Sequence, residues 1–321
     1  MVVSGGWRVF AGALVLAAGL VAPATGVAAA DPVACTTWTE STLPVPDGVG
    51  SSGVVAAAGS YVVGTGSYRW VAGSAVLIWK DRQLVDHLSF FRHTAYATDV
   101  NSSGVVALSG STTFPAASRW QAGVYTTLNG WQGEYDVRTI DVNERGDVLG
   151  VSNGKPVVWP AGSGQARLVP GTDASWSATA LADDGAVLAG SASGVYWLSE
   201  SGAVQLEGGT DVSVTAARGQ YAVGRLGQEV VRWDRQGQVV RGFEQAVEVL
   251  GVNAHGQLLG EVDNGTTEGS PAFWAGVGYP ERVNTDARVA VIADDGALYG
   301  AKLLDPWNAY PVALDCANGA R

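Results

Sequence analysis

Residues that could catalyse a reaction or hold a metal ion are few in this chain of 321 residues. The three histidines, His87, His93 and His255, form no His-x-x-x-His pair, and the sequence contains no Cys-x-x-Cys pair. Because zinc sites usually draw ligands from such short spacings, we predict neither a metal ion nor a cofactor. The sequence also lacks a Gly-x-Ser-x-Gly nucleophile elbow between a strand and a helix.

Carboxylates offer one catalytic alternative. Glycoside hydrolysis needs two carboxyl groups that flank the scissile bond, and Glu134 and Asp305 could supply such a pair from distant parts of the chain. The distance between them is not visible in the sequence. An extracellular hydrolase or lyase acting on polysaccharide therefore stays open, although the sparse chemistry favours a protein that is not an enzyme.

Asparagine and aspartate side chains recur in short turns and admit two interpretations. They could bind calcium, which prefers carboxylate and amide oxygens, or they could shape the turns. A calcium loop needs several ligands at alternate positions, and each of these turns offers at most two, so we interpret them as turn residues. The positions are Asn101, Asn143, Asp183–Asp184, Asn253 and Asp294–Asp295.

Aromatic residues with a few polar neighbours form the remaining group of candidates. Such a combination suits a carbohydrate or peptide site, but the same rings could instead cap the edges of sheets. The candidate binding residues are Tyr68, Arg69, Trp70, Phe91, Arg92, His93, Trp131, Trp307 and Tyr310. The longest loops expected around them are Thr65–Ser74, Ser89–Thr98, Asn129–Thr139, Glu261–Pro271 and Lys302–Pro311.

A repeated sequence phrase predicts the elements that position these residues. Each copy consists of a glycine, three to five mostly apolar residues and a second glycine. The first glycines of successive copies lie 34 to 45 residues apart, a period typical of propeller blades. A tryptophan follows six of the phrases at similar intervals, and we expect these six to be structural. The phrases are Gly59–Gly64, Gly104–Gly110, Gly146–Gly150, Gly185–Gly190, Gly219–Gly224, Gly256–Gly260 and Gly296–Gly300, and the tryptophans are Trp79, Trp120, Trp159, Trp197, Trp233 and Trp274.

One copy shows how each blade should be built. Four short apolar segments separated by Gly, Asn and Ser turns predict an inner strand over Thr139–Val142, then Asp147–Val151, Pro156–Trp159 and an outer strand over Gln165–Val169. Seven such units predict an all-β fold, a single seven-bladed β-propeller of four-stranded antiparallel blades. The loops after second strands and after outer strands open on one face, where most of the aromatic candidates should lie.

The units resemble the HAF repeats of bacterial extracellular proteins. That unit runs from an inner strand through Ile-Asn-x-x-Gly, Val-Val-Gly and an aromatic-Trp pair to a Gly turn and Leu. Asp141–Gly150 and Gly251–Gly260 match best, and Ala272–Trp274 comes nearest to the naming tripeptide, although its histidine is absent. The resemblance covers most of the chain and implies an exported propeller. It supplies no catalytic residues.

The two ends of the chain also predict export. Residues 1–30 read as a secretory signal peptide, with Arg8 before an uncharged apolar run and small residues before Asp31. The domain then spans residues 31–321, with blade repeats from about 52 to 315. In an exported chain the lone pair Cys35 and Cys316 predicts a disulfide, with residues 36–46 completing the last blade. Lipidation of Cys35 is the weaker alternative, because it would leave Cys316 unpaired.

The net charge of the chain argues against some classes of binding partner. The formal net charge is −11, which argues against nucleic acid and anionic lipid surfaces, since both are bound mainly through Lys and Arg. No later segment is long and apolar enough for a membrane span. We expect a secreted, monomeric binding or scaffold protein that engages a glycan, peptide or cell-envelope partner. A purely structural domain without a ligand is a further alternative.

Overall fold

A computed structural model of the protein describes residues 35, 37–110, 116–265, 269–305 and 308–317. The chain divides into two units, Met1–Pro32 and Val33–Arg321, and the described residues all belong to the second. The expected signal peptide, residues 1–30, lies outside the described residues.

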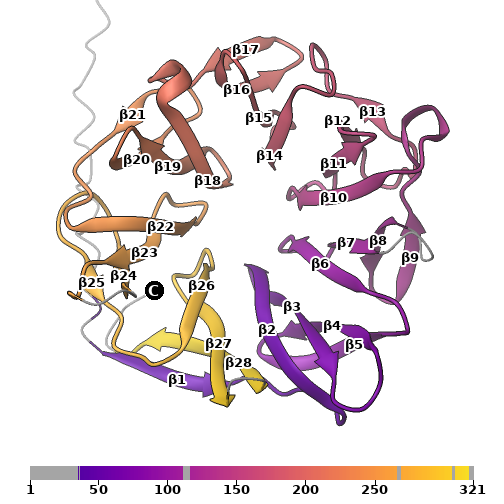
Figure 1. The fold of residues 1–321 in the computed structure, drawn as a ribbon, viewed down its shortest axis with the longest axis vertical. Coiled ribbons are helices and arrows are strands. Elements are labelled where there is room, and N and C mark those ends of the chain that lie inside the picture. The colour runs from indigo at the N-terminus through magenta and orange to yellow at the C-terminus, as the bar shows by residue number, and fades with distance from the viewer. Residues whose placement is uncertain (1–34, 36, 111–115, 266–268, 306–307, 318–321) are drawn as a thin grey trace, which may run out of the picture. The chain divides into compact units, whose positions relative to one another are not determined.

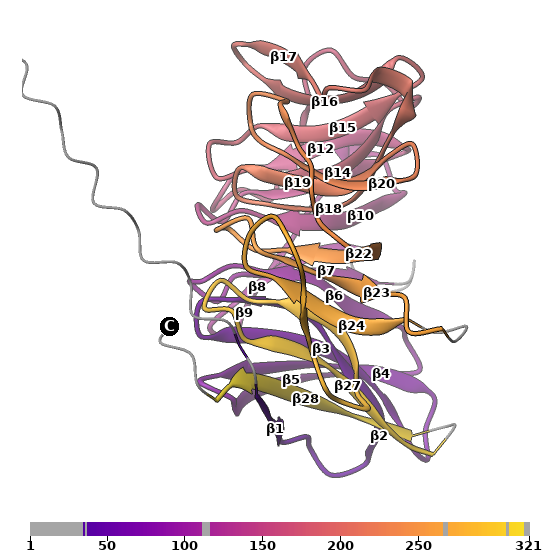
Figure 2. The same cartoon turned by 90° about the vertical axis from the view of Figure 1, so that its left-hand side faces the viewer.

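Seven antiparallel sheets of four strands form a closed ring in chain order, which confirms the predicted seven-bladed propeller (Figure 1). Figure 2 shows the strands of each blade running between the two faces of the ring. The described residues include no α-helix, only the 3₁₀ turns η1 (Trp131–Gly133) and η2 (Gly209–Asp211).

Each blade begins with its inner strand and ends with its outer strand. Blades 1 to 3 are β2 (Val49–Ala58), β3 (Tyr61–Tyr68), β4 (Gly73–Lys80) and β5 (Gln83–Phe91); β6 (Ala95–Val100), β7 (Val106–Gly110), β8 (Ala117–Gln121) and β9 (Val124–Thr127); and β10 (Val137–Val142), β11 (Val148–Ser152), β12 (Lys155–Trp159) and β13 (Arg167–Leu168). Blades 4 to 6 are β14 (Ser177–Leu181), β15 (Val187–Ser191), β16 (Gly194–Ser199) and β17 (Gly202–Gln205); β18 (Val212–Arg218), β19 (Tyr221–Leu226), β20 (Glu229–Trp233) and β21 (Val239–Val240); and β22 (Ala246–Val252), β23 (Leu258–Val262), β24 (Ser270–Trp274) and β25 (Glu281–Arg282). Blade 7 is β26 (Arg288–Ile292), β27 (Leu298–Asp305), β28 (Asn308–Cys316) and β1 (Trp38–Thr42).

The ring is closed by the N-terminal strand, as predicted. β1 pairs antiparallel with β28, and Trp38 lies opposite Cys316. Cys35 and Cys316 form a disulfide bond, with their Cα atoms 5.5 Å apart. Both ends of the domain are therefore tied into blade 7.

The two glycines of the repeated phrase are required for different reasons. The first stands in the turn after the inner strand, where Gly146 adopts φ +83°, a conformation that other residues rarely adopt. The second stands in the second strand, where a Cβ on Gly150 would lie 2.1 Å from the carbonyl oxygen of Arg138. Close approach of the two innermost strands therefore explains the second glycine here and at Gly64, Gly224, Gly260 and Gly300, whereas an added Cβ at Gly190 would meet nothing closer than 3.7 Å.

The outer strand of blade 3 is shorter than predicted. Only Arg167 and Leu168 pair with β12, whereas the sequence predicted a strand over Gln165–Val169. Gln165 instead forms a parallel bridge with Asn129 of the preceding blade. A contact between blades thus replaces the expected pairing within one sheet.

The repeat tryptophans are buried between blades, but one departs from the expected position. Trp159, for example, packs against Leu128 of the preceding blade. Trp197 lies opposite Leu188, one residue out of register with the other five, and packs with Trp233 of the following blade. Leu198 fills the vacated position. The prediction of one fixed position for all six tryptophans is therefore wrong for Trp197, because neighbouring residues of a strand face opposite sides.

Every inner strand carries a β-bulge at the same place. One extra residue interrupts the pairing of each inner strand with the second strand of its blade. A bulge re-aims a side chain and bends the strand, so seven bulges change the side chains presented around the axis of the ring. The extra residues are Val55, Thr98, Ile140, Thr179, Thr215, Leu250 and Ala290.

Candidate functional site

The loop between β3 and β4 and the end of β5 form one connected unit on blade 1. The rings of Tyr68 and Phe91 stack, with their centroids 4.9 Å apart and their planes at 29°. The Tyr68 hydroxyl donates to Ser89 Oγ at 2.5 Å, and the Arg92 N–H donates to the Ala72 carbonyl at 2.8 Å. These contacts hold the two segments together. We call residues 68–71, 91 and 92 the blade 1 platform.

The platform presents apolar surface to solvent. The exposed fractions are 87% for Trp70, 56% for Phe91 and 51% for Val71. Arg69 and Arg92 are exposed beside them. Large apolar side chains that gather on a surface mark an interaction site more often than single exposed ones do. Five of the nine predicted binding residues therefore come together here.

Three of the remaining four predicted binding residues are described: His93, Trp131 and Tyr310. His93 follows the platform, partly buried, and its N–H donates to the Phe90 carbonyl at 3.3 Å. Trp131 belongs to blade 3, where its partly buried ring lies beneath Lys155, with Nζ 4.9 Å from the ring centroid. Tyr310 is partly buried in blade 7. Trp307 lies outside the described residues.

The repeated turn asparagines tie each turn to the next blade. Asn143 Oδ1 accepts the N–H groups of Arg145 and Asp147, and Nδ2 donates to the Ala182 carbonyl of blade 4 at 3.2 Å. Asn101 and Asn253 make the corresponding bonds, so these side chains shape turns. Among the described residues no group of three or more His, Cys, Asp or Glu could hold a metal ion.

A second candidate site lies in the central channel, which holds a cavity of about 230 Å³. Asp99 and Asp141 follow the bulges of blades 2 and 3, and Arg218 reaches them from blade 5. An Arg218 guanidinium nitrogen lies 3.2 Å from Asp99 Oδ2. Burial raises the pKa of Asp141 well above its usual value, and the neighbouring Asp99 carboxylate raises it further.

Both channel carboxylates also have structural partners. Asp99 Oδ2 accepts the Val142 N–H of the next blade at 3.1 Å, and Asp141 Oδ2 accepts the Leu181 N–H at 2.6 Å. Sequence reasoning missed this pair. The available signal was an aspartate at one repeat position in blades 2 and 3, where the other blades have Ala, Gly or Val.

The predicted carboxylate pair has different surroundings. Glu134 Oε1 accepts a hydrogen bond from Lys155 Nζ at 2.8 Å, and Lys155 lowers the pKa of this carboxyl. A carboxyl with a lowered pKa is a poor general acid at neutral pH. Asp305 lies on blade 7 and accepts bonds from the backbone and side chain of Asn308. The structure therefore provides no support for Glu134 and Asp305 as a catalytic pair.

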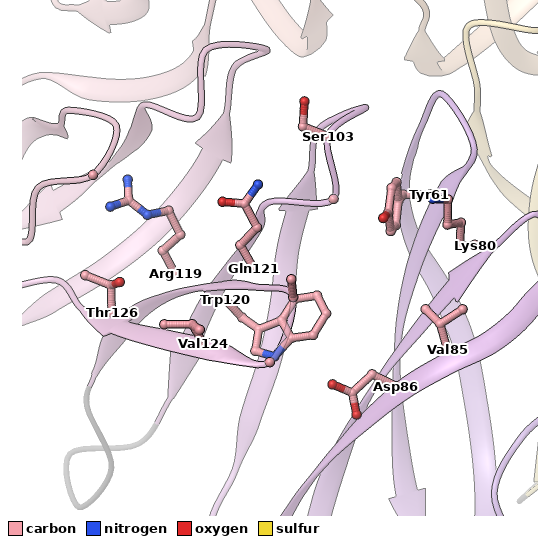
Figure 3. A pocket seen from close by; sticks show the side chains of 14 residues that line it. Tyr61, Lys80, Val85, Asp86, Ser103, Arg119, Trp120, Gln121, Val124 and Thr126 are labelled. Carbon is pink, nitrogen blue, oxygen red and sulfur yellow. The ribbon is translucent and has the colours of Figure 1, made fainter.

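A groove of about 670 Å³ lies beside the β8–β9 hairpin of blade 2 (Figure 3). Tyr61 and Lys80 line it from blade 1, with Lys80 Nζ 5.3 Å from the Tyr61 ring centroid. Arg119 lines it from blade 2 and donates to the Gly146 carbonyl at 3.0 Å. In five other blades the position of Arg119 carries an apolar residue, so this arginine departs from the repeat.

Comparison with known proteins supports only the fold. No family model matches the chain, and no curated protein matches it. A chain in a crystal structure of the mitotic checkpoint complex is 14% identical, with a TM-score of 0.50, and the match covers 94% of this chain and 98% of that one.

Two further solved structures are less similar. A gluconolactonase from Xanthomonas campestris is 14% identical over 89% of this chain and 95% of its own, with a TM-score of 0.44. The β-propeller domain of Cps50 from Myceliophteria thermophila is 11% identical over 81% and 82%, with a TM-score of 0.33. Neither carries an argument about this chain. Within the described residues no helix is long and apolar enough to cross a membrane.

Proposed function

We propose that this chain is a secreted binding protein that engages a carbohydrate through the blade 1 platform. The observation that carries the proposal is the exposed Trp70 ring, two residues along the chain from Tyr68 of the Tyr68–Phe91 stack. An aromatic ring offers a large apolar face with few rotatable bonds, and the C–H face of a sugar ring packs against such a face. Two segments that are held together also lose little conformational freedom when a ligand binds.

The cellular setting belongs to the same proposal. The disulfide between Cys35 and Cys316 is compatible with an oxidising compartment, where such bonds form and persist. The expected signal peptide and the resemblance to HAF repeats point the same way. A monomer and a cell-envelope source of the ligand stay predictions.

A glycan array tests the proposal. The oxidised protein should bind at least one class of glycan, and Trp70→Ala should weaken that binding by about tenfold or more, since truncating a central aromatic usually costs over 1 kcal/mol. Tyr135→Ala is the matched control, because Tyr135 is 92% exposed on blade 3 outside the platform. Peptide binding without glycan binding, or equal losses for the two variants, would refute the carbohydrate proposal.

A second candidate function rests on the channel. Asp141, whose pKa is raised, can hold a proton, and it lies beside a second carboxyl group, Asp99, that is paired with Arg218. A polysaccharide hydrolase or lyase could use such a pair. The backbone bonds of both carboxylates favour a packing role instead. Turnover of polysaccharide that Asp141→Asn abolishes without unfolding the protein would support the enzyme, and undiminished turnover would exclude Asp141 from it.

A further inference from the structure

The blade 1 platform differs in charge from the rest of the chain. Residues 65–74 and 89–98, which contain the platform, carry Arg69, Arg92 and His93 but no aspartate or glutamate. The whole sequence holds 30 acidic residues and a formal net charge of −11. The two segments that form the platform are therefore cationic within an acidic chain, and the adjoining segment carries one exposed carboxylate, Asp47, next to the Gly48 carbonyl that accepts the Arg69 N–H.

The two arginines are held in place by the backbone around them. The Arg69 N–H donates to the Gly48 carbonyl at 3.0 Å, and its side chain passes over Gly50, where an added Cβ would lie 2.4 Å from Arg69 Cγ. Gly50 thus leaves room for the arginine stem. Arg92 adopts φ +63°, and its N–H is bonded to Ala72. A non-glycine residue in this region is uncommon and recurs at functional sites.

Neither guanidinium is neutralised within the part of the chain that the structure describes. Arg69 and Arg92 form no ion pair there, whereas Arg82, Arg145 and Arg218 each pair with a carboxylate. The charges of the platform are therefore free to meet a ligand. A surface arginine without a partner is ordinary, but two that flank an exposed tryptophan and a stacked aromatic pair form a composite surface.

We infer that the blade 1 platform binds an anionic polysaccharide whose sugar rings carry carboxylate groups, an inference that rests on the proposed carbohydrate-binding function. The planar guanidinium donates two parallel hydrogen bonds to a carboxylate, which gives direction as well as attraction. Trp70 and Phe91 supply the apolar faces for the rings between the charged groups. Single-stranded nucleic acid also combines charge with stacking rings, and the acidic remainder of the chain repels either polyanion, so DNA serves as a competing probe in the test.

The test compares polygalacturonate with neutral dextran on the oxidised protein, with a single-stranded DNA oligonucleotide as a third probe. Polygalacturonate should bind best, and its affinity should fall as NaCl rises from about 0.05 M to about 0.5 M, because salt screens exposed charges. The R69Q/R92Q variant should bind it about tenfold or more weakly, the change expected when hydrogen bonds to a charged group are lost.

Two sets of variants separate charge from stacking. R167Q/R282Q removes the same charge at two exposed arginines outside the platform and should leave the affinity unchanged. Trp70→Ala should weaken binding to every glycan, whereas R69Q/R92Q should weaken binding to the acidic one alone. Equal losses for the two double variants would show that only net charge matters and would overturn the inference.

The possible failures are distinguishable. Equal affinity for dextran and polygalacturonate, unaffected by R69Q/R92Q, would overturn the anionic ligand and leave the carbohydrate-binding function standing. Binding to neither of these carbohydrates nor to any glycan of the array, or preferential binding to DNA, would overturn both. Salt-dependent binding of polygalacturonate lost in R69Q/R92Q and retained in R167Q/R282Q is the supporting result.

Discussion

The terminal disulfide should supply a large share of the stability of this propeller. Cys35 and Cys316 are separated by 281 residues, so the bond closes almost the whole domain into one loop. Without it, the unfolded chain gains the freedom of two separated ends. The chain-entropy relation for a loop of this length gives about 5–6 kcal/mol at 25 °C, an upper value because unfolded chains retain some structure. Domains are commonly stable by about 5–15 kcal/mol.

Urea unfolding followed by tryptophan fluorescence measures this contribution. The Cys35→Ser/Cys316→Ser variant should lose about 4–5 kcal/mol of unfolding free energy relative to the oxidised protein. The wild-type protein reduced with a thiol is the control, since it keeps both sulfur atoms in the fold. Equal losses for the variant and the reduced protein assign the effect to the cross-link.

Two results would refute the reasoning. A loss below about 1 kcal/mol in both samples would mean that closing the loop contributes far less than its length implies. A large loss in the serine variant without one in the reduced protein would assign the effect to packing around Cys35, which is only 6% exposed. If the thiol leaves the disulfide bond intact, the intact mass of the protein shows this, and that sample is excluded from the comparison.

Asn143→Ala should lower the free energy of unfolding by about 2–4 kcal/mol, because two backbone N–H groups and the Ala182 carbonyl lose their hydrogen-bond partner. A loss under about 0.5 kcal/mol in urea unfolding would contradict the stabilising role of this side chain between blades 3 and 4. The pKa of Asp141 is raised in the folded state, so its contribution to stability should be present below about pH 4 and disappear as the pH rises through that pKa. Asp141→Asn should therefore flatten the dependence of unfolding free energy on pH. Identical pH profiles for the variant and the wild-type protein would contradict this. Trp233→Phe should cost about 1 kcal/mol more than Trp197→Phe, because only Trp233 Nε1 donates to a carbonyl; equal shifts in thermal unfolding would refute the difference.

The propeller could be predicted from the sequence because its repeat is imposed by backbone geometry. Each turn after an inner strand needs a left-handed glycine, and most second strands need a residue without a Cβ, as Gly146 and Gly150 illustrate. The first requirement repeats in all seven blades and the second in five of them, with a period close to 40 residues, so residue types alone reveal the architecture. The closing disulfide was predictable for a related reason, since the chain has only two cysteines.

The displacement of Trp197 could not be predicted from the spacing of the repeats. Trp197 lies 38 residues after Trp159 and 36 before Trp233, against 39 to 41 for the other three intervals between repeat tryptophans, and the first glycines of the repeat vary more widely, from 34 to 45 residues. A shift of one residue is invisible in spacings that already vary by several residues. In a strand it nevertheless moves the ring to the opposite face, so blades 3 and 4 meet through Leu198 instead.

The channel site was hidden for a different reason. The seven bulges that shape it occur at residues of five different types, from Ala290 to Ile140, because a bulge is a property of pairing and leaves no fixed residue type behind. Without knowledge of the bulges, the direction of the next side chain cannot be worked out, and Asp99 and Asp141 look like ordinary strand residues. Alternation fails as a guide wherever an extra residue enters the ladder.

Residues that depart from the repeat indicate the candidate binding site better than residues that follow the repeat. Residues that recur in every blade are accounted for by turns, close strand approach and packing between blades. Arg69 and Trp70 lie just beyond the end of β3, and Arg92 lies just beyond the end of β5, the longest outer strand among the described residues. No need of the fold explains their exposed charges and ring. A ring of seven similar blades supplies its own control, because a side chain required by the architecture should appear in several of them. By that criterion, ligand binding explains the exposed arginines and tryptophan of the blade 1 platform better than the architecture does.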